Sequence, residues 1–312
     1  MVTFKLSRRS FVISLSSVAA SSVLPSRLNG ALELPAGPVQ SRIRFGYAAI
    51  TWGGNDIQAI KDVGEVGFRG IQLRSPILKD FGDKPNALAD LLKQHRLTFV
   101  ALSGGGPRND AYVAAEEIAT QVKHATFMKA AGALYLQMTD SARPKDRKPE
   151  SNDFKKLGRL LTEIGKRTAD LGIPMAYHNH MRSLGEAPDE VDALMDASDP
   201  KYVRLLLDVA HYAQGGGDPA KAITKYRDRI LFLHIKDVES LEPTAESTNP
   251  YRFVELGRGR VNLPAVFSAL REIKFGGWAI VELDSVPDKT RTPKESAIIS
   301  KKYLEDKIGL KI

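Results

Sequence analysis

The sequence contains no cysteine in its 312 residues. This absence excludes a disulfide-stabilised scaffold, a zinc site built on thiolates and a cysteine nucleophile. The phosphate-binding glycine motifs GxGxxG and GxxxxGK(S/T) are also missing after every predicted strand, which argues against a nucleotide-binding open sheet. A metal ion bound by this chain would therefore have imidazole and carboxylate ligands.

The composition is that of an ordinary soluble globular protein, with 43% hydrophobic and 26% charged residues. The net charge of +8 is basic, a property shared with nucleic-acid-binding proteins. Part of this charge comes from Lys5, Arg8, Arg9 and Arg27, and the rest of the chain has no long basic run. We therefore expect no nucleic-acid partner.

Residues 1–35 have the layout of an export signal. Arg8 and Arg9 precede an uncharged, mildly apolar run from Phe11 to Leu24, and the paired arginines resemble the twin-arginine signal. The run is shorter than the roughly 20 residues that span a bilayer. We expect export to the periplasm, with no stable membrane association once the signal is removed. A frayed basic N-terminus is the alternative interpretation.

From Arg42 onward, short β-rich segments alternate with helical segments eight times. The strand segments are mostly continuous apolar runs, as in parallel strands buried on both faces. The predicted strands are Ile43–Ala49, Gly70–Leu73, Thr98–Ser103, Ala133–Gln137, Pro174–His178, Val203–Asp208, Ile230–Ile235 and Trp278–Glu282. The predicted helices are Asp56–Val63, Ala87–His95, Ala111–Ala131, Asp153–Asp170, Pro188–Ala197, Pro219–Tyr226, Pro264–Ile273 and Pro293–Ile308.

Eight such units predict a single (β/α)8 TIM barrel over residues 36–312. An open, doubly wound parallel sheet is the alternative architecture. The polar insert Glu239–Pro250 is expected to form a loop over the mouth of the barrel.

Four of the six histidines lie at or just after the ends of the predicted strands five, six and seven. They are His178, His180, His211 and His234, and the carboxylates Asp208, Asp237, Glu282 and Asp284 occur near them. Neighbouring strand ends lie about 4.8 Å apart, so these side chains would crowd into one mouth. Such crowding is costly unless a cation or a substrate organises it.

Each of these residues has a simpler interpretation when it is taken alone. A histidine at a strand end is more often a hydrogen-bonded structural group, and an aspartate before a helix usually caps it. Their convergence favours a metal site. Mixed imidazole and carboxylate ligands suit Mn²⁺, Co²⁺, Zn²⁺ or Fe²⁺ better than Ca²⁺. We expect one divalent metal ion, which could be Mn²⁺, Co²⁺, Zn²⁺, Mg²⁺ or Fe²⁺.

Several short motifs follow the predicted strands five to eight. They are Tyr177-His178-Asn179-His180, Leu207-Asp208-Val209-Ala210-His211, Leu233-His234-Ile235-Lys236-Asp237, Phe253-Val254-Glu255-Leu256-Gly257-Arg258-Gly259 and Val281-Glu282. In their order and placement the chain resembles the xylose isomerase-like TIM-barrel superfamily of sugar phosphate isomerases and epimerases, which also contains endonuclease IV. The similarity extends from about Arg42 to the C-terminus and is greatest to the inosose dehydratase and 3-keto-glycoside lyase branch.

The resemblance implies one divalent metal ion bound by side chains from strands five to eight. Carried over by position, its ligands are His178, Asp208, His234 and Glu282. It also implies that His211 contacts the substrate or orients Asp208, and that Lys236 reaches the substrate. The predicted catalytic residues are Glu282, His180, Lys236 and His211.

Three further residues are predicted to bind the substrate, a small carbohydrate. Trp52 in the first loop would offer an aromatic surface to a sugar face, with core packing as the alternative. Arg258 would bind an anionic group, with a solvated loop as the alternative. Gln72 lies on the second strand, where many relatives have a glutamate.

One departure from the family pattern bears on the reaction. Many relatives have a glutamate on strand five where this chain has His178, and in the epimerases that glutamate pairs with the one on strand eight. The imidazole argues against a symmetrical two-carboxylate epimerisation. Proton abstraction next to a carbonyl, followed by elimination, suits unequal groups better, and isomerisation at the same site is the alternative.

Two alternative functions come from other functional classes. An endonuclease IV-like DNA-repair enzyme would need three metal ions and further ligands on strands two to four, where this chain has Gln72, Ser103 and Gln137. A non-catalytic sugar-binding barrel would keep the aromatic residues but would not need the set of Asp208, His234 and Glu282. The resemblance also favours a homo-oligomer.

Overall fold

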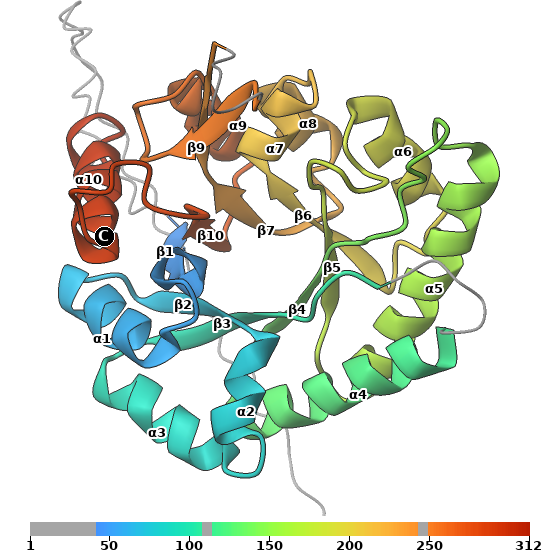
Figure 1. Cartoon of the computed structure of the whole chain (residues 1–312), viewed down its shortest axis with the longest axis horizontal. Helices are drawn as coiled ribbons and strands as arrows, with labels where there is room; N and C mark the ends of the chain where they lie inside the picture. Colours follow the sequence, from blue (N-terminus) through green and yellow to red (C-terminus); the bar gives the residue numbers. More distant parts are fainter. Residues whose placement is uncertain (1–41, 108–113, 243–248) are drawn as a thin grey trace, which may run out of the picture. The chain divides into compact units, whose positions relative to one another are not determined.

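A computed structural model describes residues 42–107, 114–242 and 249–312, so the predicted export signal lies outside the described residues. Eight parallel strands form a closed barrel in the order β1-β10-β7-β6-β5-β4-β3-β2 (Figure 1). The barrel strands are β1 Arg44–Ala48, β2 Gly70–Arg74, β3 Thr98–Ser103, β4 Tyr135–Met138, β5 Met175–His178, β6 Val203–Asp208, β7 Ile230–Ile235 and β10 Trp278–Val281. The predicted TIM barrel is therefore confirmed.

Helices surround the barrel, as each strand is followed by a helical connection (Figure 1). The α-helices are α1 Asp56–Val66, α2 Leu78–Phe81, α3 Pro85–Gln94, α4 Ala114–Ala131, α5 Ser151–Ala169, α6 Pro188–Asp196, α7 Val209–Gln214, α8 Pro219–Lys225, α9 Leu263–Glu272 and α10 Pro293–Asp306. Two 3-10 helices, Ala49–Trp52 and Ser75–Ile77, follow β1 and β2. All eight predicted helices are present, and α2 and α7 are additions.

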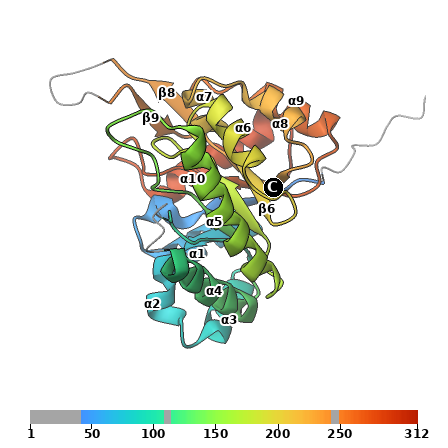
Figure 2. The same cartoon turned by 90° about the vertical axis from the view of Figure 1, so that its right-hand side faces the viewer.

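The predicted loop at Glu239–Pro250 is partly wrong. Strands β8 Asp237–Ser240 and β9 Tyr251–Val254 pair as an antiparallel hairpin, with Asp237 opposite Val254. The sequence did not predict β8, because this short strand follows β7 after one residue and carries polar residues that are typical of a loop. Figure 2 shows the two strands standing out from one end of the barrel.

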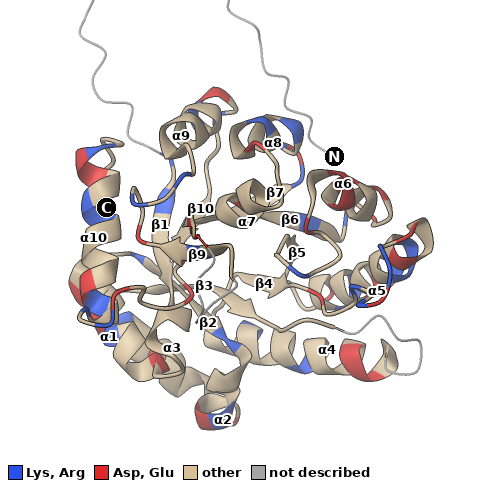
Figure 3. Ribbon diagram, turned by 45° about the horizontal axis from the view of Figure 1, so that its top comes forward, with Lys and Arg blue, Asp and Glu red and all other residues tan. Residues whose placement is uncertain are grey.

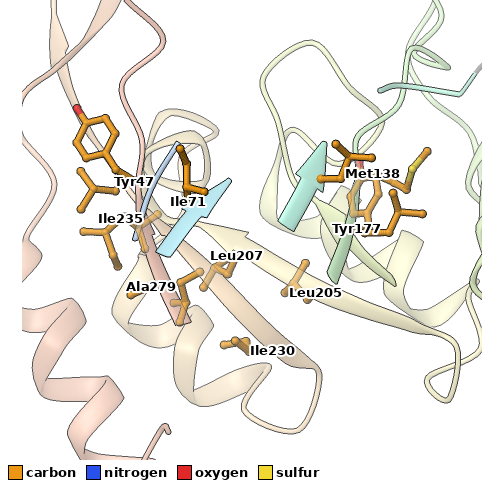
Figure 4. Close-up of a cluster of buried hydrophobic side chains, with 14 of the residues drawn as sticks. Tyr47, Ile71, Met138, Tyr177, Leu205, Leu207, Ile230, Ile235 and Ala279 are labelled. Carbon is orange, nitrogen blue, oxygen red and sulfur yellow. The ribbon is translucent and has the colours of Figure 1, made fainter. Parts of the chain in front are cut away.

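Residues on each strand alternate between the barrel interior and the layer under the helices. The outer layer is apolar and includes Tyr47, Ile71, Leu205 and Leu207 (Figure 4). The inner set packs separately around Trp278. A Cβ on Gly70 would lie 2.5 Å from the Trp278 ring, so glycine is what admits the indole to the narrow interior.

The same alternation aims the polar strand ends at the barrel axis. On β7, Phe232 lies in the inner set, and His234 and Lys236 follow at steps of two residues. On β6, inner Leu206 is followed in the same way by Asp208. The candidate site is thus the next layer above the inner apolar core.

The helices around the barrel carry charges of both signs. Lys and Arg are interleaved with Asp and Glu on α1, α5 and α10 in the described part of the chain (Figure 3). None of the described helices is long and apolar enough to cross a membrane.

Candidate metal centre and active site

Four buried side chains at the carboxyl ends of the strands form a compact cluster. His178 ends β5, Asp208 ends β6, His234 lies on β7 and Glu282 follows β10. One possible ligand atom from each lies within 4.8 Å of the others. These are the four residues that the sequence analysis assigned to the metal, and the structure brings them together.

Asp208 is oriented by the backbone on both sides of it. Its Oδ1 accepts hydrogen bonds of 2.8 Å from the amides of Ala210 and His211, and so caps α7. Asn179 donates to the carbonyl of Asp208 and accepts from its amide, at 3.2 and 2.9 Å. Oδ2 is left to face the cluster, 3.5 Å from Nε2 of His178 and 3.5 Å from Nδ1 of His234.

His234 is placed to hold a cation. Its Nδ1 is buried without a hydrogen-bond partner and lies 3.4 Å from Oε1 of Glu282 and 3.5 Å from Oδ2 of Asp208. Burial by itself would lower the pKa of His234, but the two carboxylates outweigh burial and raise the pKa to about 9. The orphaned nitrogen between two carboxylates fits a divalent metal ion, with nitrogen and oxygen as ligands.

His178 has a different environment, although it lies in the same cluster. Burial lowers its pKa to about 4, so the ring is neutral at physiological pH. The carboxylates respond in the opposite way. Burial would raise the pKa values of Asp208 and Glu282, but the surrounding imidazoles and Lys236 hold both well below their usual range, which leaves both carboxylates ionised.

Lys236 is fully buried beside the cluster. Its Nζ donates to Oε1 of Glu282 at 3.0 Å and to Oδ1 of Asp284 at 2.5 Å. It also lies 3.9 Å from the ring centroid of Phe253 on the hairpin. Burial would lower the pKa of Lys236, but Asp284 and Glu282 raise it overall, so the side chain is a buried ammonium ion.

His211 and His180 extend the cluster toward the hairpin. Nδ1 of His211 accepts a hydrogen bond from the amide of Met181 at 3.2 Å, so the hydrogen of its neutral ring is on Nε2. That Nε2 lies 3.3 Å from Nζ of Lys236. Two donors therefore point into the same small volume. The ring of His180 packs against the ring of His211, with centroids 3.9 Å apart and planes tilted by 37°.

A cavity of about 360 Å³ opens beside these residues and is the space available to a substrate. Its polar lining consists of Gln72, Arg74, Ser75, Ser103, Gln137, Thr139, His178, His180, Glu282 and Asp284. Gln72, which the sequence analysis assigned to substrate binding, therefore lines the cavity. Arg74, Gln137 and the hairpin residue Phe253 were missed as site residues; for the first two, the signal was their position at strand ends.

Two predicted substrate-binding residues are not in this cavity, which corrects the sequence analysis. Trp52 is buried at the end of the 3-10 helix after β1, where its indole donates to Asp62 at 2.8 Å and packs edge-on against Tyr47. This is the core-packing alternative. The side chain of Arg258 is 46% exposed and lies 3.9 Å from Glu255, outside the cavity lining.

Comparison with known proteins agrees with the barrel. The family model described as xylose isomerase-like TIM barrel matches residues 60–305, so the chain belongs to that family. An inosose dehydratase of Lacticaseibacillus casei is 28% identical over 294 residues, covering 84% of this chain and 96% of that protein. The predicted resemblance is thus confirmed.

Solved structures with the same fold include enzymes and a zinc-bound protein. The IolI protein with a bound zinc atom has a TM-score of 0.69 and 21% identity, covering 84% of this chain and 97% of that one. An L-ribulose 3-epimerase has a TM-score of 0.69 and 18% identity, covering 86% and 94%.

Proposed function

We propose that this protein is a divalent-metal-dependent lyase acting on an inosose or a 3-keto-sugar. It would remove a proton next to a carbonyl and expel an oxygen substituent from the adjacent carbon. The observation that carries the proposal is the buried cluster of His178, Asp208, His234 and Glu282 beside an open cavity. The inosose dehydratases among its relatives support the dehydratase form of this reaction.

The cluster residues would hold the metal ion, with His234 and the two carboxylates as its principal ligands. When bound, a divalent metal ion polarises a carbonyl oxygen and so makes the neighbouring C–H more acidic. The chain itself must then supply a base and an acid. Both have to reach the cavity, since proton transfer requires hydrogen-bond distance to the substrate.

His180 is the better candidate for the base. Its Nδ1 donates to the carbonyl of Met181 at 2.6 Å, so the free lone pair is on Nε2, and the ring lines the cavity. Glu282 is less free to accept a proton, because Oε1 already accepts from Lys236 and faces His234.

Lys236 and His211 are the candidates for the acid. Both lie directly behind the cavity lining: Lys236 donates to Glu282 and Asp284, which line the cavity. His211 packs against His180, which also lines it. Their Nζ and Nε2 atoms lie 3.3 Å apart and both carry hydrogen toward the same region. One oxygen placed between them would accept from both donors. This arrangement would stabilise the developing charge on a departing hydroxyl or alkoxide and deliver a proton to it.

The test is to incubate the metal-loaded protein with inososes and 3-keto-glucosides and to follow the ultraviolet absorbance of a conjugated enone. We expect enone formation by the wild type and a loss of about 10²-fold or more in His180→Gln, because a positioned base contributes that much. His95→Gln removes an imidazole at the end of α3 and should leave the rate unchanged. An epimerised product without enone would refute the lyase assignment.

The nuclease alternative is less well supported. Within residues 42–107, 114–242 and 249–312, one cluster of metal-ligand type is present, whereas the nuclease would need ligands for three ions. One metal equivalent per chain, measured on the purified protein, fits the proposed lyase; three would favour the nuclease, and none the sugar-binding barrel.

We further propose that the chain is exported to the periplasm through its twin-arginine-type N-terminus. Support comes from Arg8 and Arg9 before the uncharged run at Phe11–Leu24. The double substitution Arg8→Lys and Arg9→Lys keeps the charge and should leave the protein in the cytoplasmic fraction of a twin-arginine-competent bacterium. Unchanged periplasmic recovery would contradict the proposal.

A further inference from the structure

Two buried glutamines connect the outer nitrogens of the two cluster histidines. Nε2 of His234 donates to Oε1 of Gln72 at 2.9 Å, and Nε2 of Gln72 donates to Oε1 of Gln137 at 3.0 Å. Nε2 of Gln137 then lies 2.9 Å from Nδ1 of His178. All four side chains are buried. We call this chain of hydrogen bonds the glutamine relay.

The glutamine relay has a direction because each amide has one donor end and one acceptor end. In either direction, the histidine at one end donates from its outer nitrogen and the histidine at the other end accepts there. A neutral imidazole carries one hydrogen. Therefore one of the two histidines presents a lone pair to the cluster, and the other presents an N–H. Lone pairs from both would force the amide groups of Gln72 and Gln137 to face each other donor to donor.

The carboxylates determine which direction holds. Nδ1 of His234 lies between Glu282 and Asp208, at 3.4 and 3.5 Å. Among the described residues, Nε2 of His178 has one carboxylate this close, that of Asp208 at 3.5 Å. A cation is therefore held most strongly at Nδ1 of His234. Whether this cation is a proton or a metal ion, the hydrogen on Nε2 stays in place and donates to Gln72. Gln72 then donates to Gln137, and Gln137 donates to Nδ1 of His178, which is therefore an acceptor.

We propose that Gln72 and Gln137 are positioning residues that make His234 the one imidazole ligand of the centre and keep a hydrogen on Nε2 of His178. The inference rests on the metal site of the proposed function. It reduces the ligand set expected from the sequence to Asp208, His234 and Glu282. His178 instead becomes a hydrogen-bond donor at the edge of the cavity.

This assignment agrees with what each histidine needs from its surroundings. A metal-bound histidine donates its other ring N–H to an acceptor, and His234 does so to Gln72. His178 receives a hydrogen bond at that position instead. Three protein ligands also leave coordination positions open for a substrate, as in catalytic rather than structural metal sites.

The experiment uses the full chain labelled with ¹⁵N-histidine and loaded with ¹¹³Cd²⁺. We expect ¹¹³Cd–¹⁵N coupling to one histidine, through Nδ1, and its loss in His234→Gln. The ring of His178 should show a hydrogen-bearing Nε2 and an unprotonated Nδ1. Coupling to His178 would overturn the inference but leave the metal site standing. Coupling to neither histidine would overturn both.

A substitution within the glutamine relay gives a second, independent readout. Gln137→Glu offers only acceptor atoms, so Nδ1 of His178 would donate to it and Nε2 would turn its lone pair to the centre. We expect a second ¹¹³Cd–¹⁵N coupling and cadmium binding tighter by about tenfold or more. In Gln137→Glu combined with His178→Gln, the added charge is the same but the coupling count should return to one. No second coupling in Gln137→Glu would overturn the inference.

Discussion

Replacing Asp208 by asparagine is expected to remove the metal ion and to lower kcat/KM by about 10³-fold or more. The carboxylate oxygen Oδ2 is the atom that faces both His178 and His234 at 3.5 Å. An amide has no charge to offset a cation, and its NH₂ group would point a donor at the centre. Loss of the metal removes several kcal/mol of stabilisation of the developing charge.

The substitution is designed to leave the fold intact. The remaining amide oxygen can still accept from the backbone of Ala210 and His211 and so still caps α7. Asp218→Asn is the matched control, because Asp218 caps α8 with hydrogen bonds to Ala220 and Lys221 and is exposed. Metal content by elemental analysis and Tm are the measurements. Full metal content in Asp208→Asn would show that the ligand assignment is wrong.

Lys236→Met is expected to lower kcat by about 10²–10⁴-fold while the metal content stays unchanged. Methionine matches the length of the lysine stem and packs against Phe253, but it cannot protonate a leaving group. The effect should depend on the substrate. A 3-keto-glucoside with a nitrophenolate leaving group needs no proton, so its elimination should be largely retained.

This dependence on the leaving group separates a proton donor from a structural lysine. If the variant lost the same factor with alkyl and nitrophenyl glycosides, Lys236 would not be the acid. Lys225→Met is the matched control. Lys225 also donates to an aspartate, Asp192 at 2.6 Å, and lies 5.5 Å from the centroid of the Tyr226 ring, but it is exposed on α8. Its loss should leave both eliminations unchanged.

The barrel could be predicted from the sequence because its signals are local. Continuous apolar runs such as Val203–Asp208 and Ile230–Ile235 match β6 and β7 to the residue. The four cluster residues were also predictable, since parallel strands bring their carboxyl ends to one face. Each of the four could be assigned to the cluster from its position at the end of a predicted strand, and that position can be read from the sequence.

The remaining features depend on contacts that the sequence does not display. Gln72 and Gln137 are 65 positions apart, and their pairing appears only once β2 and β4 are in the barrel. Trp52 is of a residue type that often packs against sugars, but its indole donates a hydrogen bond to Asp62 inside the protein. The hairpin was missed because Asp237 and Glu239 resemble loop residues, while the buried side chain of Val238 anchors it.

The capping of α7 by Asp208 ties the reactive centre to local folding. One carboxylate oxygen secures the first turn of the helix and the other faces the cluster, so the backbone of α7 fixes the orientation of the oxygen at the centre. The conformational entropy of ordering this side chain is lost when the chain folds, not when a ligand arrives. The affinity of the centre for a cation therefore depends in part on a helix of six residues, Val209–Gln214. A substitution that frays this helix should weaken cation binding even if it touches no residue of the cluster.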